Sequence, residues 1–259
     1  MNFNIGDLVT RKSYNHDLVF KIIDKENEYI LKGVNVRLFA DSSEDDLQIY
    51  EDKIDKEEIN FEKRLNDEKI LDRDEYFYMP GKILHIDGDN EYLSRCINYY
   101  NKQGLWSKGI CLKEEEVAEN IEKLLNEYQP NILVITGHDA YYKKIGSKDN
   151  LNSYKNSKHF VNSINMARHY EHSHEKLIII AGACQSDFEQ LIKAGANFAS
   201  SPKRINIHAL DPAIIASCIS LSDITEDINL KLIIDKTKYG KDGIGGIKTK
   251  GTMYIGYPR

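Results

Sequence analysis

The chain has 259 residues, of which 41% are hydrophobic and 29% are charged, as is usual for a globular protein with room for one large domain and a small one. Its net charge of −6 disfavours a general nucleic-acid binder, and its longest apolar runs, about five residues, fall far short of the roughly 20 that a membrane span needs. Four cysteines without CxxC spacing and the lack of a visible signal peptide predict a reduced, cytoplasmic protein with a thiol available for chemistry.

The first 50 residues contain short β-like runs separated by glycine and asparagine. These runs cover residues 7–11, 19–23, 29–32, 36–39 and 47–50. Five short strands at this spacing predict a small SH3-like β-barrel over residues 1–50. Residues 51–78 follow as a highly charged segment with loosely periodic apolar positions, which we interpret as an exposed, protease-sensitive linker.

Residues 79–259 alternate between apolar runs and amphipathic segments. The predicted strands are 82–87, 108–112, 132–136, 177–181 and 197–200, and the predicted helices are 91–103, 114–128, 154–170, 187–194 and 208–220. Near-continuous apolar strands separated by helices predict an α/β domain, a doubly wound and mostly parallel sheet with helices on both faces. The glycine-rich tail, residues 244–257, is predicted to form a hairpin at the sheet edge.

A histidine and a cysteine follow the two most apolar of these predicted strands. His138 comes after residues 132–136, and Cys184 comes after residues 177–181. Ligands bind beyond the carboxyl ends of the strands in an open parallel sheet, so we expect both side chains at one crevice, on adjacent central strands. A neighbouring imidazolium lowers the pKa of a thiol and makes the thiolate a nucleophile, which predicts a Cys–His pair.

The residues around this pair form two short motifs, ITGHDA and AGACQS. Gly137 and Gly182 allow sharp turns and close approach of a substrate, while Ala183 and Gln185 flank the cysteine. The N–H of Cys184 is a candidate oxyanion donor, helped by an N–H from the turn at residues 137–139. A lone cysteine after a strand is usually only a small buried apolar residue, so these residues alone leave the two interpretations evenly balanced.

Other polar residues allow simpler interpretations. Asp87 and Asp89 cap the following helix or hold a cation, and capping is the commoner use. The histidines at positions 169, 172 and 174 suit a solvated loop better than a metal site, and His208 has no role beyond a surface or site-rim residue. We therefore expect neither a metal nor a cofactor. Cys96, Cys111 and Cys218 are interpreted as packing residues.

The motifs ITGHDA and AGACQS resemble those of the caspase-like, or clan CD, cysteine peptidases. There an apolar strand leads to the base histidine and the next strand leads to Ala-Cys, which implies a caspase-like fold for this domain. Asp139 stands where that family has glycine after the histidine, and the pentapeptide around the cysteine is only partly kept as Gly182-Ala183-Cys184-Gln185-Ser186. The first departure puts the second oxyanion donor in doubt.

A longer resemblance covers nearly the whole chain. The segments FNIGDLVTRKSYNHDLVFKI, YMPGKILHIDGD, PNILVITGHDAY, SKHFV, AGACQS, AGANFASSPKRINIHALDP and GIGGIKTKG resemble the YabG family of sporulation proteases, in the same order. The resemblance implies a protease of the mother-cell cytoplasm that trims spore coat and cortex-associated proteins near basic residues. It also implies that His138 and Cys184 are the catalytic residues.

A preference for basic residues calls for acidic or polar side chains near the site. Asp139, Asp211 and Ser201 are the candidates for substrate contact, because each lies near a predicted strand end or helix start. Asp187 occupies a similar position, but a capping role for the helix after Cys184 suits it equally well.

Two other functions compete with a peptidase. The opening of the α/β domain, KILHIDGDNEYL, also resembles a response-regulator receiver with Asp87 and Asp89 as its acidic pair, although a phosphoacceptor aspartate should end the third strand and Thr136-Gly137-His138 stands there. The other alternative is a non-catalytic scaffold for spore-coat assembly that docks through the N-terminal barrel.

Overall fold

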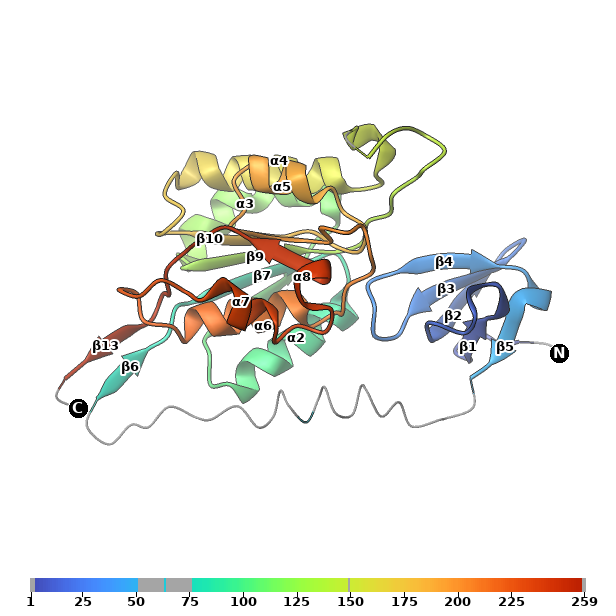
Figure 1. Ribbon diagram of the computed structural model, residues 1–259, viewed down its shortest axis with the longest axis horizontal. Helices are drawn as coiled ribbons and strands as arrows, with labels where there is room; N and C mark the ends of the chain where they lie inside the picture. The colour runs from blue at the N-terminus through green and yellow to red at the C-terminus, as the bar shows by residue number, and fades with distance from the viewer. Residues whose placement is uncertain (1–2, 51–62, 64–75, 149, 258–259) are drawn as a thin grey trace. The chain divides into compact units, whose positions relative to one another are not determined.

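The computed structural model describes residues 3–50, 63, 76–148 and 150–257. The chain divides into two compact units, residues 1–71 and 72–259, which are described separately (Figure 1). The predicted division at residues 50 and 78 stays a prediction, because most of the proposed linker lies outside the described residues. Phe77 and Tyr78, which the sequence assigns to the linker, belong instead to strand β6 (Phe77–Met79).

The smaller unit contains a five-stranded antiparallel sheet in the order β4-β3-β2-β1-β5. The strands are β1 (Leu8–Arg11), β2 (Phe20–Lys25), β3 (Tyr29–Gly33), β4 (Phe39–Ser42) and β5 (Leu47–Ile49). Alternate residues of β2 and β3 are buried, so one face of the sheet covers an apolar core that includes Phe20, Ile22 and Leu31. Closure of this sheet into an SH3-like barrel stays a prediction. The fourth strand begins at Phe39, where the sequence predicted that it would end.

The larger unit contains a six-stranded sheet in the order β12-β11-β10-β9-β7-β8. Its strands are β7 (Ile83–Asp87), β8 (Ser107–Cys111), β9 (Ile132–Thr136), β10 (Ile178–Ala181), β11 (Phe198–Ser200) and β12 (Ile244–Gly246). The first five are parallel, while β12 runs antiparallel to β11 at the edge. The strand order reverses between β7 and β9, which is where doubly wound sheets bind their ligands.

Helices cover both faces of this sheet (Figure 1). One face carries α3 (Glu114–Tyr128), α4 (Ser157–Tyr170) and α5 (Phe188–Lys193), and the other carries α2 (Asn90–Lys102), α6 (Asp211–Ser220) and α7 (Leu230–Ile234), with the short α8 (Gly240–Gly243) preceding β12. One core cluster joins α3, α4 and α5 to alternate strand residues such as Leu133, Ile135 and Ile179. These strands are buried along their length, which explains their continuous apolar runs. The predicted α/β architecture with helices on both faces is therefore confirmed, whereas the caspase-like identity stays a prediction.

The hairpin predicted for residues 244–257 is wrong. β12 pairs with β11, and β13 (Tyr254–Gly256) pairs with β6 in a separate two-stranded sheet. Gly246 allows the first pairing, because a Cβ there would lie 2.4 Å from the Phe198 ring. The chain between the two strands passes the end of α6, where the N–H of Thr252 donates to the carbonyl of Ile219 at 3.1 Å.

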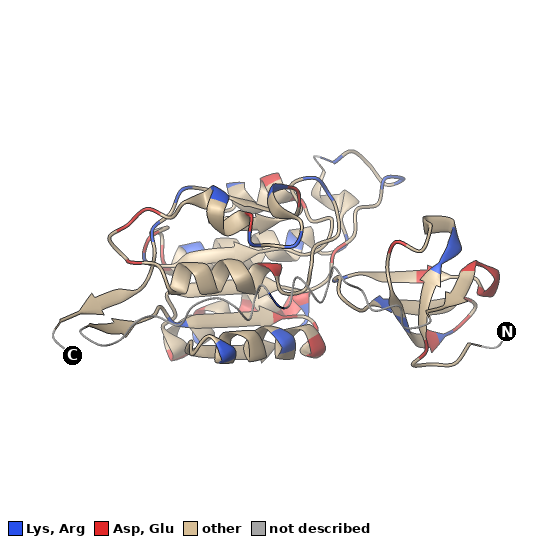
Figure 2. Cartoon of the chain, turned by 60° about the horizontal axis from the view of Figure 1, so that its bottom comes forward, with Lys and Arg blue, Asp and Glu red and all other residues tan. Residues whose placement is uncertain are grey.

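Basic and acidic side chains are interspersed along the helices and loops of the larger unit (Figure 2). Among the residues that the structure describes, no helix has both the length and the apolarity needed to cross a bilayer.

Candidate active site

The predicted histidine and cysteine lie at equivalent places beyond two hydrogen-bonded parallel strands. Ile135 of β9 pairs with Ala181 of β10, so the prediction that these two strands are adjacent is confirmed. His138 lies three residues beyond Ile135, and Cys184 lies three residues beyond Ala181. Because neighbouring strands are about 4.8 Å apart, this register brings the two loops side by side at the carboxyl end of the sheet.

Two side-chain hydrogen bonds join these loops directly. The hydroxyl of Ser186 donates to Asp139 Oδ2 at 2.9 Å, and the N–H of Tyr141 donates to Gln185 Oε1 at 3.3 Å. The N–H of Gly182 also donates to the carbonyl of Ile135 at 3.0 Å, which extends the pairing past the end of β10. The loop of the histidine and the loop of the cysteine are thus one hydrogen-bonded assembly.

Cys184 is fully buried beside the segment that leads to α6. Its Sγ accepts the N–H of Ile207 at 3.3 Å, and the thiol donates to the carbonyl oxygen of the same residue at 3.8 Å. The N–H contact favours the thiolate that a nucleophile needs, whereas burial and the carbonyl contact favour the neutral thiol. His208 follows Ile207 and is also buried, so it is not a surface residue, and the alternative of a site-rim residue stays a prediction.

His138 is held at its backbone and flanked at its ring. Its N–H donates to Glu114 Oε1 at 2.7 Å, and its carbonyl accepts from Asn156 Nδ2 at 2.9 Å. The ring has a carboxylate near each nitrogen: Glu114 Oε1 lies 3.8 Å from Nδ1, and Asp89 Oδ2 lies 3.9 Å from Nε2. The ring of Tyr92 lies 5.8 Å away between centroids. These contacts place a basic imidazole between two acids.

The sequence analysis missed Glu114. It is the first residue of α3, and burial raises the pKa of its carboxyl, although the hydrogen bond from the N–H of His138 opposes this shift. Glu114 lies three residues beyond the end of β8, just as His138 and Cys184 follow the ends of β9 and β10. Its position after a strand is therefore the signal that could have identified it. Three consecutive glutamates begin this helix, however, and the sequence alone does not distinguish the inward one.

Two of the three candidates for substrate contact are buried carboxylates. Asp139 accepts hydrogen bonds from the N–H groups of Ala140 and Asn156 and from the hydroxyls of Ser157 and Ser186. Burial raises its pKa, and these four bonds oppose the shift. Asp211 accepts the N–H groups of His208 and Lys238, and complete burial raises its pKa to about 6. Both carboxylates organise the protein interior in this structure.

Ser201, the third candidate, supports the loop of the cysteine. It is buried. Its hydroxyl donates to the carbonyl of Ile205 at 2.7 Å and accepts the N–H of Gln185 at 3.1 Å. Ser201 and Gln185 both have left-handed backbone conformations, with φ of 63° and 59°. Such conformations cost about 1–3 kcal/mol each in non-glycine residues and concentrate at functional sites. Gly182 has φ of 107°, a conformation that suits glycine.

Asp89 and Asp187 have the capping role predicted for them, whereas Asp87, predicted with Asp89 as a cap of the same helix, does not cap α2. Asp89 accepts the N–H groups of Glu91 and Tyr92 at the start of α2, and Asp187 accepts the N–H of Gln190 at the start of α5. Asp87 accepts the N–H of Asp89 and the hydroxyl of Thr136. Within the described residues, no group of three or more His, Cys, Asp or Glu side chains has an arrangement that could hold a metal ion.

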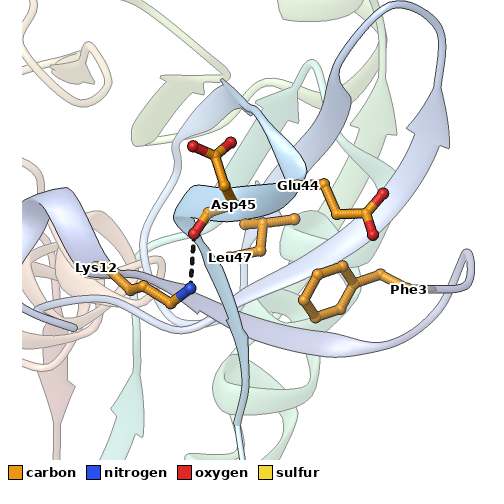
Figure 3. Close-up of a pocket in the computed structure, with 5 residues that line it drawn as sticks. All are labelled: Phe3, Lys12, Glu44, Asp45 and Leu47. Carbon is orange, nitrogen blue, oxygen red and sulfur yellow. Dashed lines mark hydrogen bonds between the residues drawn. The ribbon is translucent and has the colours of Figure 1, made fainter. Parts of the chain in front are cut away.

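A separate shallow pocket of about 450 Å³ lies in the smaller unit (Figure 3). Phe3, Lys12, Glu44, Asp45 and Leu47 line it, and Lys12 Nζ donates to the carbonyl of Asp45 at 2.6 Å. No cysteine or histidine is among these lining residues, and we place the chemistry of a Cys–His pair at the ends of β9 and β10.

Two comparisons with known proteins give matches that extend over nearly the whole chain. A family model described as YabG peptidase U57 matches residues 4–258. The chain is 45% identical over 288 aligned residues to the sporulation-specific protease YabG of Bacillus subtilis (strain 168), and the alignment covers 100% of this chain and 99% of that protein. No solved structure matches the chain.

Proposed function

The chain belongs to the YabG peptidase U57 family, and on that basis we propose that it is a cysteine endopeptidase with Cys184 as nucleophile and His138 as base. The observation that carries this proposal is the equivalent position of the two residues beyond Ile135 and Ala181, in loops that are hydrogen-bonded to each other. A nucleophile and its base must lie within hydrogen-bond reach of each other, and residues in neighbouring loops can meet this requirement.

The reaction would proceed by acyl transfer. The Cys184 thiolate attacks the carbonyl carbon of the scissile peptide bond, and a C–S bond forms while the carbonyl oxygen becomes an oxyanion. The C–N bond then breaks, and the imidazolium of His138 gives its proton to the leaving amine. His138 next takes a proton from water, whose oxygen attacks the thioester; the acid product leaves and the sulfur is released.

The proposed substrates are spore coat and cortex-associated proteins, cut near basic residues in the mother-cell cytoplasm. The support for a sporulation role is the family itself. The support for a basic preference is Asp89, whose carboxylate lies 3.9 Å from Nε2 of His138, because a carboxylate at the site attracts lysine and arginine side chains. Replacement of each Lys and Arg of a cleaved peptide by Gln should slow cleavage if this preference is real.

The direct test is cleavage of a coat-protein substrate by the wild-type chain and by Cys184→Ala and His138→Ala. We expect both variants to fold and to lose cleavage, and Cys111→Ala, which removes an exposed thiol, to keep it. Undiminished cleavage by Cys184→Ala would refute the cysteine mechanism. Binding of the coat protein with no cleavage, even by the wild type, would instead support the scaffold alternative.

The strand order also occurs in response-regulator receivers, so the receiver alternative needs its own test. Asp139, the acid nearest the end of β9, is buried and accepts four internal hydrogen bonds, which argues against a phosphoacceptor. Incubation with acetyl phosphate and Mg²⁺ followed by mass measurement should show no phosphorylated protein.

A further inference from the structure

We propose that Glu114 is the positioning residue that orients His138 and stabilises its protonated form. This inference rests on the proposed function, because it assigns to Glu114 the role of third group beside the Cys184–His138 pair. The sequence and the family resemblance left that third group unidentified.

The first argument is the double contact between Glu114 and His138. One carboxylate oxygen, Oε1, accepts the backbone N–H of His138 at 2.7 Å and lies 3.8 Å from Nδ1 of the ring. The hydrogen bond fixes the backbone position of His138, and a carboxylate 3.8 Å from the ring favours the imidazolium by its charge. At that distance the contact with Nδ1 is electrostatic and is not a hydrogen bond.

The second argument is the space that two glycines leave for this carboxylate. A Cβ on Gly137 would lie 2.3 Å from Glu114 Oε1, and a Cβ on Gly88 would lie 2.6 Å from the same atom. Both distances are too short for a real contact, so alanine at either position would displace the carboxylate. The loops after β7 and β9 thus accommodate Glu114 between them.

The third argument is the contrast with the neighbouring glutamates of the same helix turn. Acids are common in the first turn because the helix dipole favours them, and this alone would explain Glu115 and Glu116. Glu115 is exposed, and Glu116 accepts the N–H of Lys113 in a capping box. Only the side chain of Glu114, among these three, contacts the residue predicted to act as base.

Several charged groups share this environment. Burial is the main cause that raises the pKa of Glu114, and Asp87 on β7 and Glu115 on α3 raise it further. Asp89, at the start of α2, faces the other nitrogen of the ring. Cys111, at the end of β8, has its own pKa raised by burial and by the acids Asp87, Asp89 and Glu114. A test must therefore separate Glu114 from Asp89.

The decisive measurement is the pKa of His138 by ¹⁵N NMR titration of the imidazoles in the full chain, with His138→Gln used to assign the signal. In Glu114→Gln the pKa should fall by roughly one unit, because the amide can still accept the backbone N–H but carries no charge. Glu116→Gln is the matched control on the same helix turn and should leave the pKa unchanged. Asp89→Asn, which keeps the helix cap, measures the effect of the other carboxylate.

Gly88→Ala is a second, independent variant because it substitutes neither Glu114 nor His138. It should lower the pKa of His138 in the same direction as Glu114→Gln, since the new methyl group displaces the carboxylate. In peptide cleavage, kcat of Glu114→Gln should fall roughly tenfold with little change in KM, because a lower imidazole pKa reduces the fraction of the thiolate–imidazolium pair.

The inference is overturned if folded Glu114→Gln and Gly88→Ala both leave the pKa of His138 at the wild-type value. That result can be recognised whether or not the chain is a cysteine peptidase, because the titration does not depend on cleavage. Conversely, full cleavage by Cys184→Ala would end the proposed function and leave the titration result intact.

Discussion

Asp139 should be one of the most sensitive positions in the larger unit. Its carboxylate accepts four hydrogen bonds: Ala140 N–H at 2.9 Å, Asn156 N–H at 2.7 Å, Ser157 Oγ at 2.5 Å and Ser186 Oγ at 2.9 Å. Asp139→Ala removes the acceptor from two buried hydroxyls and two part-buried backbone N–H groups. An unsatisfied buried donor costs about 1–3 kcal/mol, but the hydroxyls can reorient and the carboxylate no longer has to be desolvated, so we expect a net loss of about 3–5 kcal/mol.

Urea unfolding followed by fluorescence measures this loss in the correct unit, because Trp106 is the single tryptophan of the chain and lies in the larger unit. Asp235→Ala is the matched control, since Asp235 is exposed and its loss should change the unfolding free energy by less than about 0.5 kcal/mol. Asp139→Asn should lose about 1–2 kcal/mol, because the amide oxygen can still accept the two backbone N–H groups. An unfolding free energy of Asp139→Ala equal to that of the wild type would refute the reasoning.

Three further predictions concern the same unit. Gly182→Ala should destabilise it by roughly 1–3 kcal/mol in urea unfolding, because φ is 107° and the new Cβ would lie 2.8 Å from Leu191 Cδ1; an unchanged midpoint would contradict this. Arg168→Met should cost about 2–4 kcal/mol by the same assay, because the guanidinium donates to five protein oxygens. Burial lowers the pKa of this guanidinium to about 10, and Lys in its place should recover only part of the loss. Burial raises the pKa of Asp211 to about 6, so the folded chain binds this proton more tightly than the unfolded chain. The contribution of Asp211 to stability should therefore fall by about 2 kcal/mol as pH rises from about 4 to 6, and Asp211→Asn should remove that part of the pH dependence.

The sequence predicted the framework of the larger unit well because burial determines it. The strands that became β9 and β10 are apolar except for Thr136 at the end of β9, and the structure pairs them at the centre of the sheet. Helix α3 begins and ends where its apolar spacing predicts. Boundaries were less accurate where the predicted helix starts at a polar segment: α4 begins at Ser157 rather than residue 154, after a short 3₁₀ turn, and α6 begins at Asp211 rather than residue 208.

The site was predictable only in part, because the sequence shows which residues follow a strand but not where their side chains point. The register of β9 and β10 accounts for the two loops that carry His138 and Cys184. The inward direction of Glu114 depends on the two glycines that face it from other loops, and no local pattern reveals such a contact. The burial of Asp139 and Asp211 has the same cause, since their partners are up to 47 residues away in the chain.

The hydrogen bonds of the two loops limit which backbone N–H groups can act as oxyanion donors. The N–H of His138 donates to Glu114, that of Ala140 donates to Asp139, that of Ala183 donates to Ser186, and that of Gln185 donates to Ile205. These four groups are therefore engaged within the protein and do not point at a substrate. The second donor predicted from the turn at residues 137–139 is thereby restricted to Gly137 or Asp139, beside the N–H of Cys184 predicted as the first. The hydrogen bonds of the Asp139 carboxylate fix the conformation of this turn. A fixed turn can hold a backbone N–H directed at an oxyanion, which is the role of the turn that contains glycine in caspase-like peptidases.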